Sequence, residues 1–204
     1  MGWMAGIWLA ALGLSASFAA AAVEVRVLDE QGRPLPEAIV WVQPGVGETP
    51  PRRGVMDQVR RSFQPYILAV QVGSEVEFPN SDDINHHVYS FSPAKRFELR
   101  ISPGDRGQSL RFDKAGLVTI GCNIHDWMLA YILVLDTPWF EQTDAEGRAR
   151  IDLPEGSDRR VYAWHPRIAE PGGQVGVALE GEHIELRLKR ALKPDPRVPE
   201  GGYR

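Results

Sequence analysis

Apolar and polar residues alternate over short runs through most of the chain after residue 22. Val23, Val25 and Val27, for example, are separated by the polar residues Glu24 and Arg26. This alternation has the period of a half-buried β-strand, and no stretch repeats convincingly with the period of a helix. Turn-forming residues separate the runs, which predicts an all-β sandwich. The predicted strands include residues 23–28, 38–42, 63–70, 75–78, 97–101, 109–112, 117–121, 129–135, 160–164 and 184–188.

The start of the chain has a different pattern. Residues 3–18 are almost wholly apolar, and four alanines follow at 19–22. An apolar run before small residues is typical of a signal peptide, so we expect residues 1–22 to direct export. The first residues carry no Lys or Arg, which is atypical, and a retained membrane anchor is the alternative, although the run is short for a span. No later segment is apolar enough to cross a membrane.

Composition narrows the function classes. The chain has 204 residues, enough for one large domain or two small ones, and a formal net charge of −4. Its basic residues occur as scattered pairs with no long run, so we expect no nucleic-acid partner. There is a single cysteine, Cys122, which excludes an internal disulfide. A lone cysteine in an exported protein needs another explanation, and metal binding is one.

The residues around that cysteine supply the candidate chemistry. His125 follows Cys122 by three residues and Met128 follows by three more, while His86 and His87 lie upstream. A thiolate, two imidazoles and a weak thioether are the ligands of a blue copper site. Adjacent residues on a strand point to opposite faces, so one of the two upstream histidines faces the cysteine.

Residues 56–136 carry a resemblance. The motifs Phe-Pro-Asn-x-Asp at 78–82, His-His-Val-Tyr-Ser-Phe-Ser at 86–92 and Gly-Cys-Asn-Ile-His-Asp-Trp-Met at 121–128 resemble the cupredoxin family, which includes plastocyanin and amicyanin. These motifs are also similar to those of bacterial exported proteins of the plastocyanin-like or methylamine-utilisation group. The resemblance covers roughly half the chain, and it implies a Greek-key β-sandwich that holds one type 1 copper.

The resemblance also assigns roles to residues. Counting six residues from Asn80, as in similar cupredoxins, selects His86, so the implied metal ligands are His86, Cys122, His125 and Met128. His87 then stands where the family often has a polar residue that ties the ligand loops together. An apolar patch for partner docking is implied around His125, built from Ile124, Trp127 and Met128, although Trp127 buried in the core is an equal alternative. The residues expected to support the ligands or to contact a partner are His87, Asn80, Asn123, Ile124 and Trp127.

The rest of the chain resembles a second family. Residues 27–40 and 143–156 are similar to the two halves of a transthyretin-like, carboxypeptidase-regulatory-like β-sandwich. We therefore expect a split small sandwich, residues 23–54 and 138–192, with a cupredoxin domain inserted at 55–137 and a disordered tail at 193–204. The alternative is two β extensions that pack separately on the cupredoxin.

The expected function is electron transfer in the periplasm, without catalysis, between redox partners such as a cytochrome or a dehydrogenase. Three alternatives stay open. The first is delivery or storage of Cu(I). The second is an enzyme with a second copper, which needs His87, His165 and His183 to converge. The third is an adhesion or carbohydrate-binding role for the small sandwich. We expect His165 and His183 to be structural.

Overall fold

The computed structural model describes residues 21–44, 50–153 and 159–197. Most of the predicted signal segment therefore lies outside the described residues. Among those described, no helix is long and apolar enough to cross a membrane. Apart from one short 3-10 turn at Pro171–Gly173, the regular elements are strands. They are β1 (Ala21–Leu28), β2 (Ile39–Gln43), β3 (Gly54–Val55), β4 (Asp57–Val59), β5 (Ser62–Gln64), β6 (Ile67–Gln71), β7 (Ser74–Glu77), β8 (His86–Ser92), β9 (Lys95–Ile101), β10 (Ser109–Phe112), β11 (Gly116–Cys122), β12 (His125–Leu135), β13 (Phe140–Gln142), β14 (Arg148–Leu153), β15 (Arg160–Trp164), β16 (Gln174–Ala178) and β17 (His183–Arg187).

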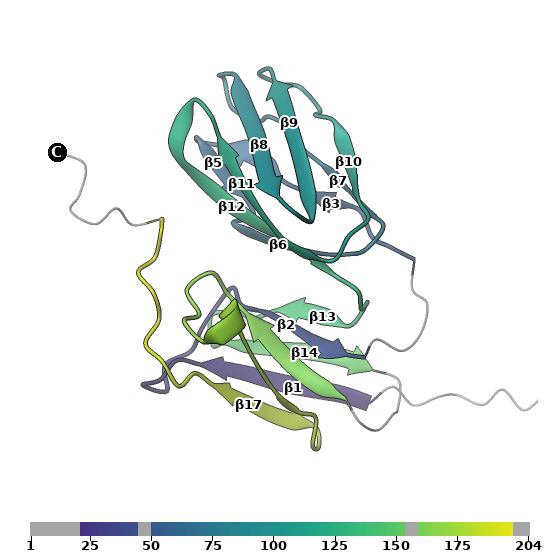
Figure 1. Cartoon of the computed structure of the whole chain (residues 1–204), viewed down its shortest axis with the longest axis vertical. Helices are drawn as coiled ribbons and strands as arrows, with labels where there is room; N and C mark the ends of the chain where they lie inside the picture. Colours follow the sequence, from purple (N-terminus) through teal and green to yellow (C-terminus); the bar gives the residue numbers. More distant parts are fainter. Residues whose placement is uncertain (1–20, 45–49, 154–158, 198–204) are drawn as a thin grey trace, which may run out of the picture.

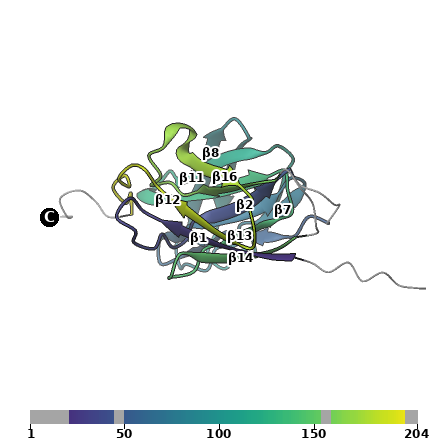
Figure 2. The same ribbon diagram turned by 90° about the horizontal axis from the view of Figure 1, so that it is seen from below.

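The strands form two stacked bodies, which lie one below the other in Figure 1 and overlap when viewed from below in Figure 2. The upper body is a β-sandwich. A five-stranded sheet in the order β6-β12-β11-β8-β9 packs against a three-stranded sheet, β10-β7-β3, and the β4–β5 hairpin lies beside them. The inward rows of both sheets fill one apolar core, in which Val76, Phe78, Val118 and Ile120 are fully buried. This body is the cupredoxin-like sandwich.

The lower body combines strands from both ends of the chain. β1 pairs antiparallel with β14 and parallel with β17, and this sheet faces a second one in the order β13-β2-β15-β16. The alternating valines of β1 point into a separate apolar core, together with Ile151 of β14 and Val161 of β15. Segments before and after the upper body therefore share one core.

The two central strands of the sheet β13-β2-β15-β16, β2 and β15, are apolar on both faces. Val40 of β2 points into the lower core, whereas Trp41 of β2 and Trp164 of β15 belong to the core of the upper body. The ring of Trp164 packs edge-on against Tyr131 of β12, with ring centroids 5.6 Å apart, and Tyr131 packs in the same way against Tyr66. This explains why β2 is a nearly continuous apolar run instead of an alternating one.

Two sequence predictions are corrected by the structure. The strand predicted at 63–70 is two strands, because Pro65 has no N–H for a ladder and the chain breaks between Gln64 and Ile67. The tail predicted to be disordered from residue 193 is instead bound through residue 197. Arg197 forms an ion pair with Glu37 at 2.8 Å and lies 4.2 Å from the ring of Tyr66. The remaining tail residues, 198–204, lie outside the described part of the chain.

Candidate metal centre

The strand pattern brings the candidate donors to one end of the upper sandwich. On β11, Val118, Ile120 and Cys122 are buried in alternation, so the cysteine ends a row of core residues. On β8, His86 is buried and His87 points to the outer face. The ladder between β11 and β12 shifts register at Cys122, which pairs with His125. Two neighbouring strands and one tight loop therefore position three side chains.

The three donors converge on a common point. The Sγ atom of Cys122 lies 3.7 Å from Nδ1 of His86 and 3.7 Å from Nδ1 of His125. All three donor atoms lie within 4.8 Å of one another. A metal ion bound about 2.3 Å from sulfur and about 2.0 Å from nitrogen at tetrahedral to trigonal angles requires sulfur–nitrogen separations of about 3.5–3.8 Å. The donor positions therefore fit a metal ion without rearrangement.

The chemistry of the donors indicates which metal ion the site would bind. One thiolate and two imidazoles, with a methionine three residues after the second histidine, form the set that selects copper in a type 1 site. Met128 is buried in the same core cluster as Cys122, after two exposed residues on β12. The set fits a single type 1 copper, whose chemistry is reversible one-electron transfer.

Asp82 orients one of these ligands and was not predicted from the sequence. Its Oδ2 atom lies 2.8 Å from Nε2 of His86 and also accepts a hydrogen bond from the backbone N–H of Arg61 at 2.8 Å, while its Oδ1 accepts one from Arg60. Burial alone raises the pKa of Asp82, but the hydrogen bonds from Arg61, His86 and Arg60 together lower it below the ordinary value. An ionised carboxylate on Nε2 keeps the proton there and leaves Nδ1 free to bind a metal.

Asn80 holds the loop that carries Asp82. Its Nδ2 donates to the carbonyl oxygen of Ile84 at 2.8 Å and to that of Ile101 at 3.2 Å. Its Oδ1 accepts the backbone N–H of Asp82 at 3.0 Å. The buried amide of Asn80 therefore fixes the loop that leads to His86.

His87 ties the two ligand segments together on the outer face. Its Nε2 contacts Glu98 of β9 at 2.6 Å, and its Nδ1 lies 3.4 Å from the side-chain amide of Asn123. The backbone N–H of Asn123 also donates to the carbonyl oxygen of His87 at 2.9 Å. His87 thus links β9 to the residue that follows Cys122.

The loop around His125 exposes apolar side chains. Ile124 is 53% exposed and Trp127 is 51% exposed, so the alternative of a buried Trp127 is wrong. Met128 is buried and does not belong to this patch, because the alternation along β12 turns it inward. The Trp127 ring lies 5.3 Å from the His125 ring, and its Nε1 donates to the carbonyl oxygen of Arg61 at 3.2 Å. Burial first, then the charges of His86 and Arg61, lower the pKa of His125, which favours its neutral, metal-binding form.

The remaining histidines lie in the lower body, away from this cluster. His165 is buried, and this burial, with the charges of Arg167 and Arg197, lowers its pKa to about 4. His183 is exposed and pairs with Glu24 at 3.2 Å. Within the described ranges, the one grouping of histidine, cysteine and acidic residues with metal-binding spacing is that of His86, Cys122 and His125.

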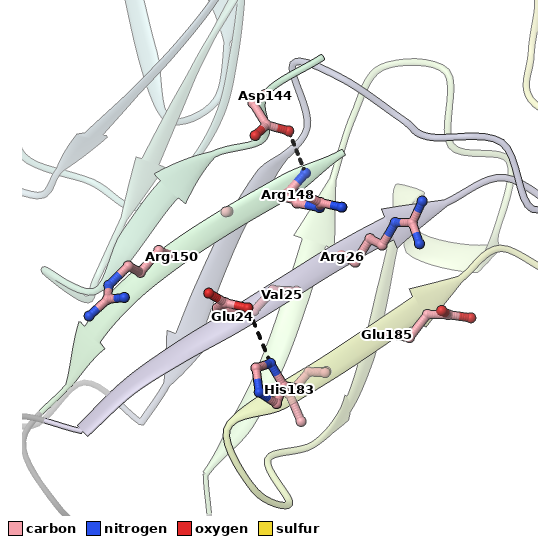
Figure 3. Close-up of a pocket in the computed structure, with 10 residues that line it drawn as sticks. Glu24, Val25, Arg26, Asp144, Arg148, Arg150, His183 and Glu185 are labelled. Carbon is pink, nitrogen blue, oxygen red and sulfur yellow. Dashed lines mark hydrogen bonds and ion pairs between the residues drawn. The ribbon is translucent and has the colours of Figure 1, made fainter. Parts of the chain in front are cut away.

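A hollow of about 440 Å³ lies on the outer face of the sheet β14-β1-β17 (Figure 3). Its lining is mostly charged and includes Arg26 and Arg148, which are directly opposite each other on β1 and β14. His183 and Glu24 form an ion pair within it. This surface is on the other body from His86, Cys122 and His125.

Comparisons with known proteins give similar solved structures. No protein-family model and no curated protein matches the chain. A copper-containing nitrite reductase from Thermus scotoductus SA-01 is 26% identical over 40% of this chain and 22% of its own, with a TM-score of 0.38. A single-residue mutant of amicyanin in its reduced state is 23% identical over 40% of this chain and 81% of its own, with a TM-score of 0.37. A purple cupredoxin from Nitrosopumilus maritimus is 21% identical over 40% of this chain and 99% of its own, with a TM-score of 0.36.

The chain thus spans about a fifth of the length of the nitrite reductase that it matches. The likenesses are partial, and the assignment of a copper centre rests on the donor geometry. The upper body is an all-β, cupredoxin-like sandwich that positions one donor at the start of β8, one at the end of β11 and one at the start of β12. This donor set fits a single type 1 copper.

Proposed function

We propose that this protein is a periplasmic carrier of single electrons that uses one type 1 copper held by His86, Cys122, His125 and Met128. The observation that carries the proposal is the position of Cys122 Sγ, 3.7 Å from Nδ1 of each histidine. The donors lie at the separations that a bound copper ion requires. A site that does not rearrange between oxidation states exchanges electrons with little reorganisation.

The surroundings of the ligands support this role. Asp82 and Asn80 fix His86, and the Cys122–His125 pair closes a tight loop between two paired strands. In this proposal Met128 is the weak fourth ligand, so no coordination position is left for a substrate. That is why we propose a carrier and not an enzyme.

The proposal also covers organisation and partners. We infer that the lower body is a split small sandwich with the cupredoxin inserted in it, since residues on both sides of the insertion share one apolar core. We infer export through residues 1–22 and a redox protein, such as a cytochrome or a dehydrogenase, as partner. Electrons would pass through the edge of His125, beside the exposed Ile124 and Trp127.

The test begins with copper loading. We expect one copper per chain, an intense visible band from the cysteine thiolate to Cu(II), and loss of that band in Cys122→Ser. Stopped-flow mixing of the reduced protein with a periplasmic c-type cytochrome should show rapid electron exchange. Slow exchange together with fast transfer of Cu(I) to a chelating acceptor would instead indicate a copper-delivery protein. Colourless Cu(II) with oxygen or nitrogen ligation would exclude a type 1 centre.

A further inference from the structure

The hairpin between β4 and β5 has an unusual turn. Val59 pairs with Ser62, so the loop contains two residues, Arg60 and Arg61. Both have positive φ angles, 52° and 57°. Two-residue hairpins with φ positive at both positions favour Asn-Gly, because these residues adopt the left-handed region at low cost. For other residues this conformation costs about 1–2 kcal/mol each, so two adjacent arginines strain the turn.

Hydrogen bonds connect the turn to both candidate histidine ligands through an intermediate residue, Asp82 for His86 and Trp127 for His125. Asp82 accepts hydrogen bonds from the backbone N–H groups of Arg60 and Arg61, and the same carboxylate binds Nε2 of His86. On the other side, the carbonyl oxygen of Arg61 accepts a hydrogen bond from the indole of Trp127, next to His125. These contacts use backbone atoms of the turn, so Asn and Gly would make them equally well.

The side chains of the turn are not explained by the fold. Arg60 and Arg61 are exposed, and neither guanidinium group makes a hydrogen bond or an ion pair within the described part of the chain. Two carboxylates lie near the turn. Asp82 is bound to the turn and to His86, and its side chain is only 9% exposed. Asp126, beside His125, is exposed, so the two exposed guanidinium groups outnumber the one exposed carboxylate. The hairpin uses this backbone conformation, but it does not require arginine at either position, so the strained pair points to a function of the side chains.

We propose that Arg60 and Arg61 are the cationic edge of a docking surface whose apolar part is Ile124 and Trp127, and that it binds a redox protein with carboxylates around its exposed cofactor edge. This inference rests on the proposed electron-carrier function. The whole chain has a net charge of −4, so an acidic partner would be repelled by most of the surface. A local pair of positive charges beside His125 orients such a partner for electron transfer.

The first test measures docking without electron transfer. Hexacyanochromate(III) is a redox-inert, paramagnetic trianion that broadens the NMR signals of nearby amides. With the Cu(I) protein, we expect broadening at Arg60, Arg61, Ile124 and Trp127. The double variant Arg60→Asn/Arg61→Gly should lose this broadening while its stability stays equal or rises, because Asn-Gly relieves the turn. Arg60→Lys/Arg61→Lys should keep most of it.

A charge-matched control separates local from general electrostatics. Arg26→Gln/Arg148→Gln removes the same charge from the outer face of the lower body (Figure 3) and should leave the broadening unchanged. Broadening elsewhere in wild type, or equal loss in the two neutralised variants, would overturn the inference.

The second test measures oxidation of the Cu(I) protein by two one-electron reagents of opposite charge. Each oxidation moves one electron from the protein to the reagent. At low ionic strength, Arg60→Asn/Arg61→Gly should slow oxidation by hexacyanoferrate(III) about tenfold, and salt should remove most of the difference. Oxidation by tris(phenanthroline)cobalt(III), a cation, should not slow. Equal slowing with both reagents would contradict docking by charge. Slow oxidation of wild type by both reagents, with the broadening intact, would count against the proposed function alone.

Discussion

Replacing Asp82 with asparagine tests how much of the copper site is set by a residue that does not touch the metal. The carboxylate uses both oxygens: Oδ2 for His86 and Arg61, and Oδ1 for Arg60. An amide has one oxygen, so in either orientation its NH₂ group faces a donor. The orientation that keeps the hydrogen bond to His86 loses the one to Arg60. In either orientation the substitution also removes the negative charge.

The size of the effect follows from these losses. Removing a partner of a metal-bound histidine typically lowers metal affinity by about 10–100-fold. Since asparagine still accepts the Nε2–H of His86, we expect the lower end, about tenfold for Cu(II). Cu(I) affinity should change less, because the negative charge that the substitution removes stabilises Cu(II) more than Cu(I). A tenfold loss selective for Cu(II) corresponds to a rise in reduction potential of about 59 mV.

The measurements are chelator competition for both copper ions and cyclic voltammetry. Asp83→Asn is the matched control, because it makes the same chemical change one residue further on, at an exposed carboxylate. We expect the Asp83 variant to keep both affinities within about twofold and to shift the potential by less than about 20 mV. Wild-type affinity and potential in Asp82→Asn, or equal shifts in the two variants, would refute the role assigned to Asp82.

Three further predictions concern single residues. His86→Ala should abolish the blue band, whereas His87→Ala should keep it with at most a shift, and visible spectra of the copper-loaded variants distinguish them. Met128→Gln should keep the blue site and lower the reduction potential, because a harder axial ligand favours Cu(II); an unchanged potential would argue against axial ligation. The pKa of buried His165 is lowered from 6.5 to about 4, so the unfolded state binds a proton first as pH falls. Stability should therefore be full above pH 6.5 and decrease by up to about 3 kcal/mol as pH falls towards 4, and denaturant melts of His165→Gln should show a weaker pH dependence.

The sequence predicted the parts of the site that depend on order and spacing. Cys122 and His125 lie three residues apart on a strand–loop–strand pattern, and the structure brings them together with His86. Alternation on β8 required His86 and His87 to point to opposite faces, and they do. Several strands, such as β10 and β15, have the predicted bounds because a regular alternating run defines them.

The missed features depend on contacts between segments distant in sequence. Nothing in residues 60–61 indicates that Asp82, some twenty residues later, accepts both of their N–H groups. The polar tail has a composition typical of disorder, and its binding depends on Arg197 reaching Glu37 and Tyr66. Of these missed features, only the contact between Asp82 and His86 has a signal in the sequence. The signal is an aspartate in a turn, four residues before the candidate histidine ligand.

The sheet whose central strands are apolar on both faces has a consequence for any attempt to shorten this protein. A fragment limited to the upper sandwich would leave Tyr131 without Trp164, and Tyr66 without Arg197. It would present bare aromatic surface to water and tend to self-associate. The shared sheet also makes the two sandwiches tumble as one particle. A molecule that binds the lower body would therefore also fix the orientation of the copper site at the far end of the upper body.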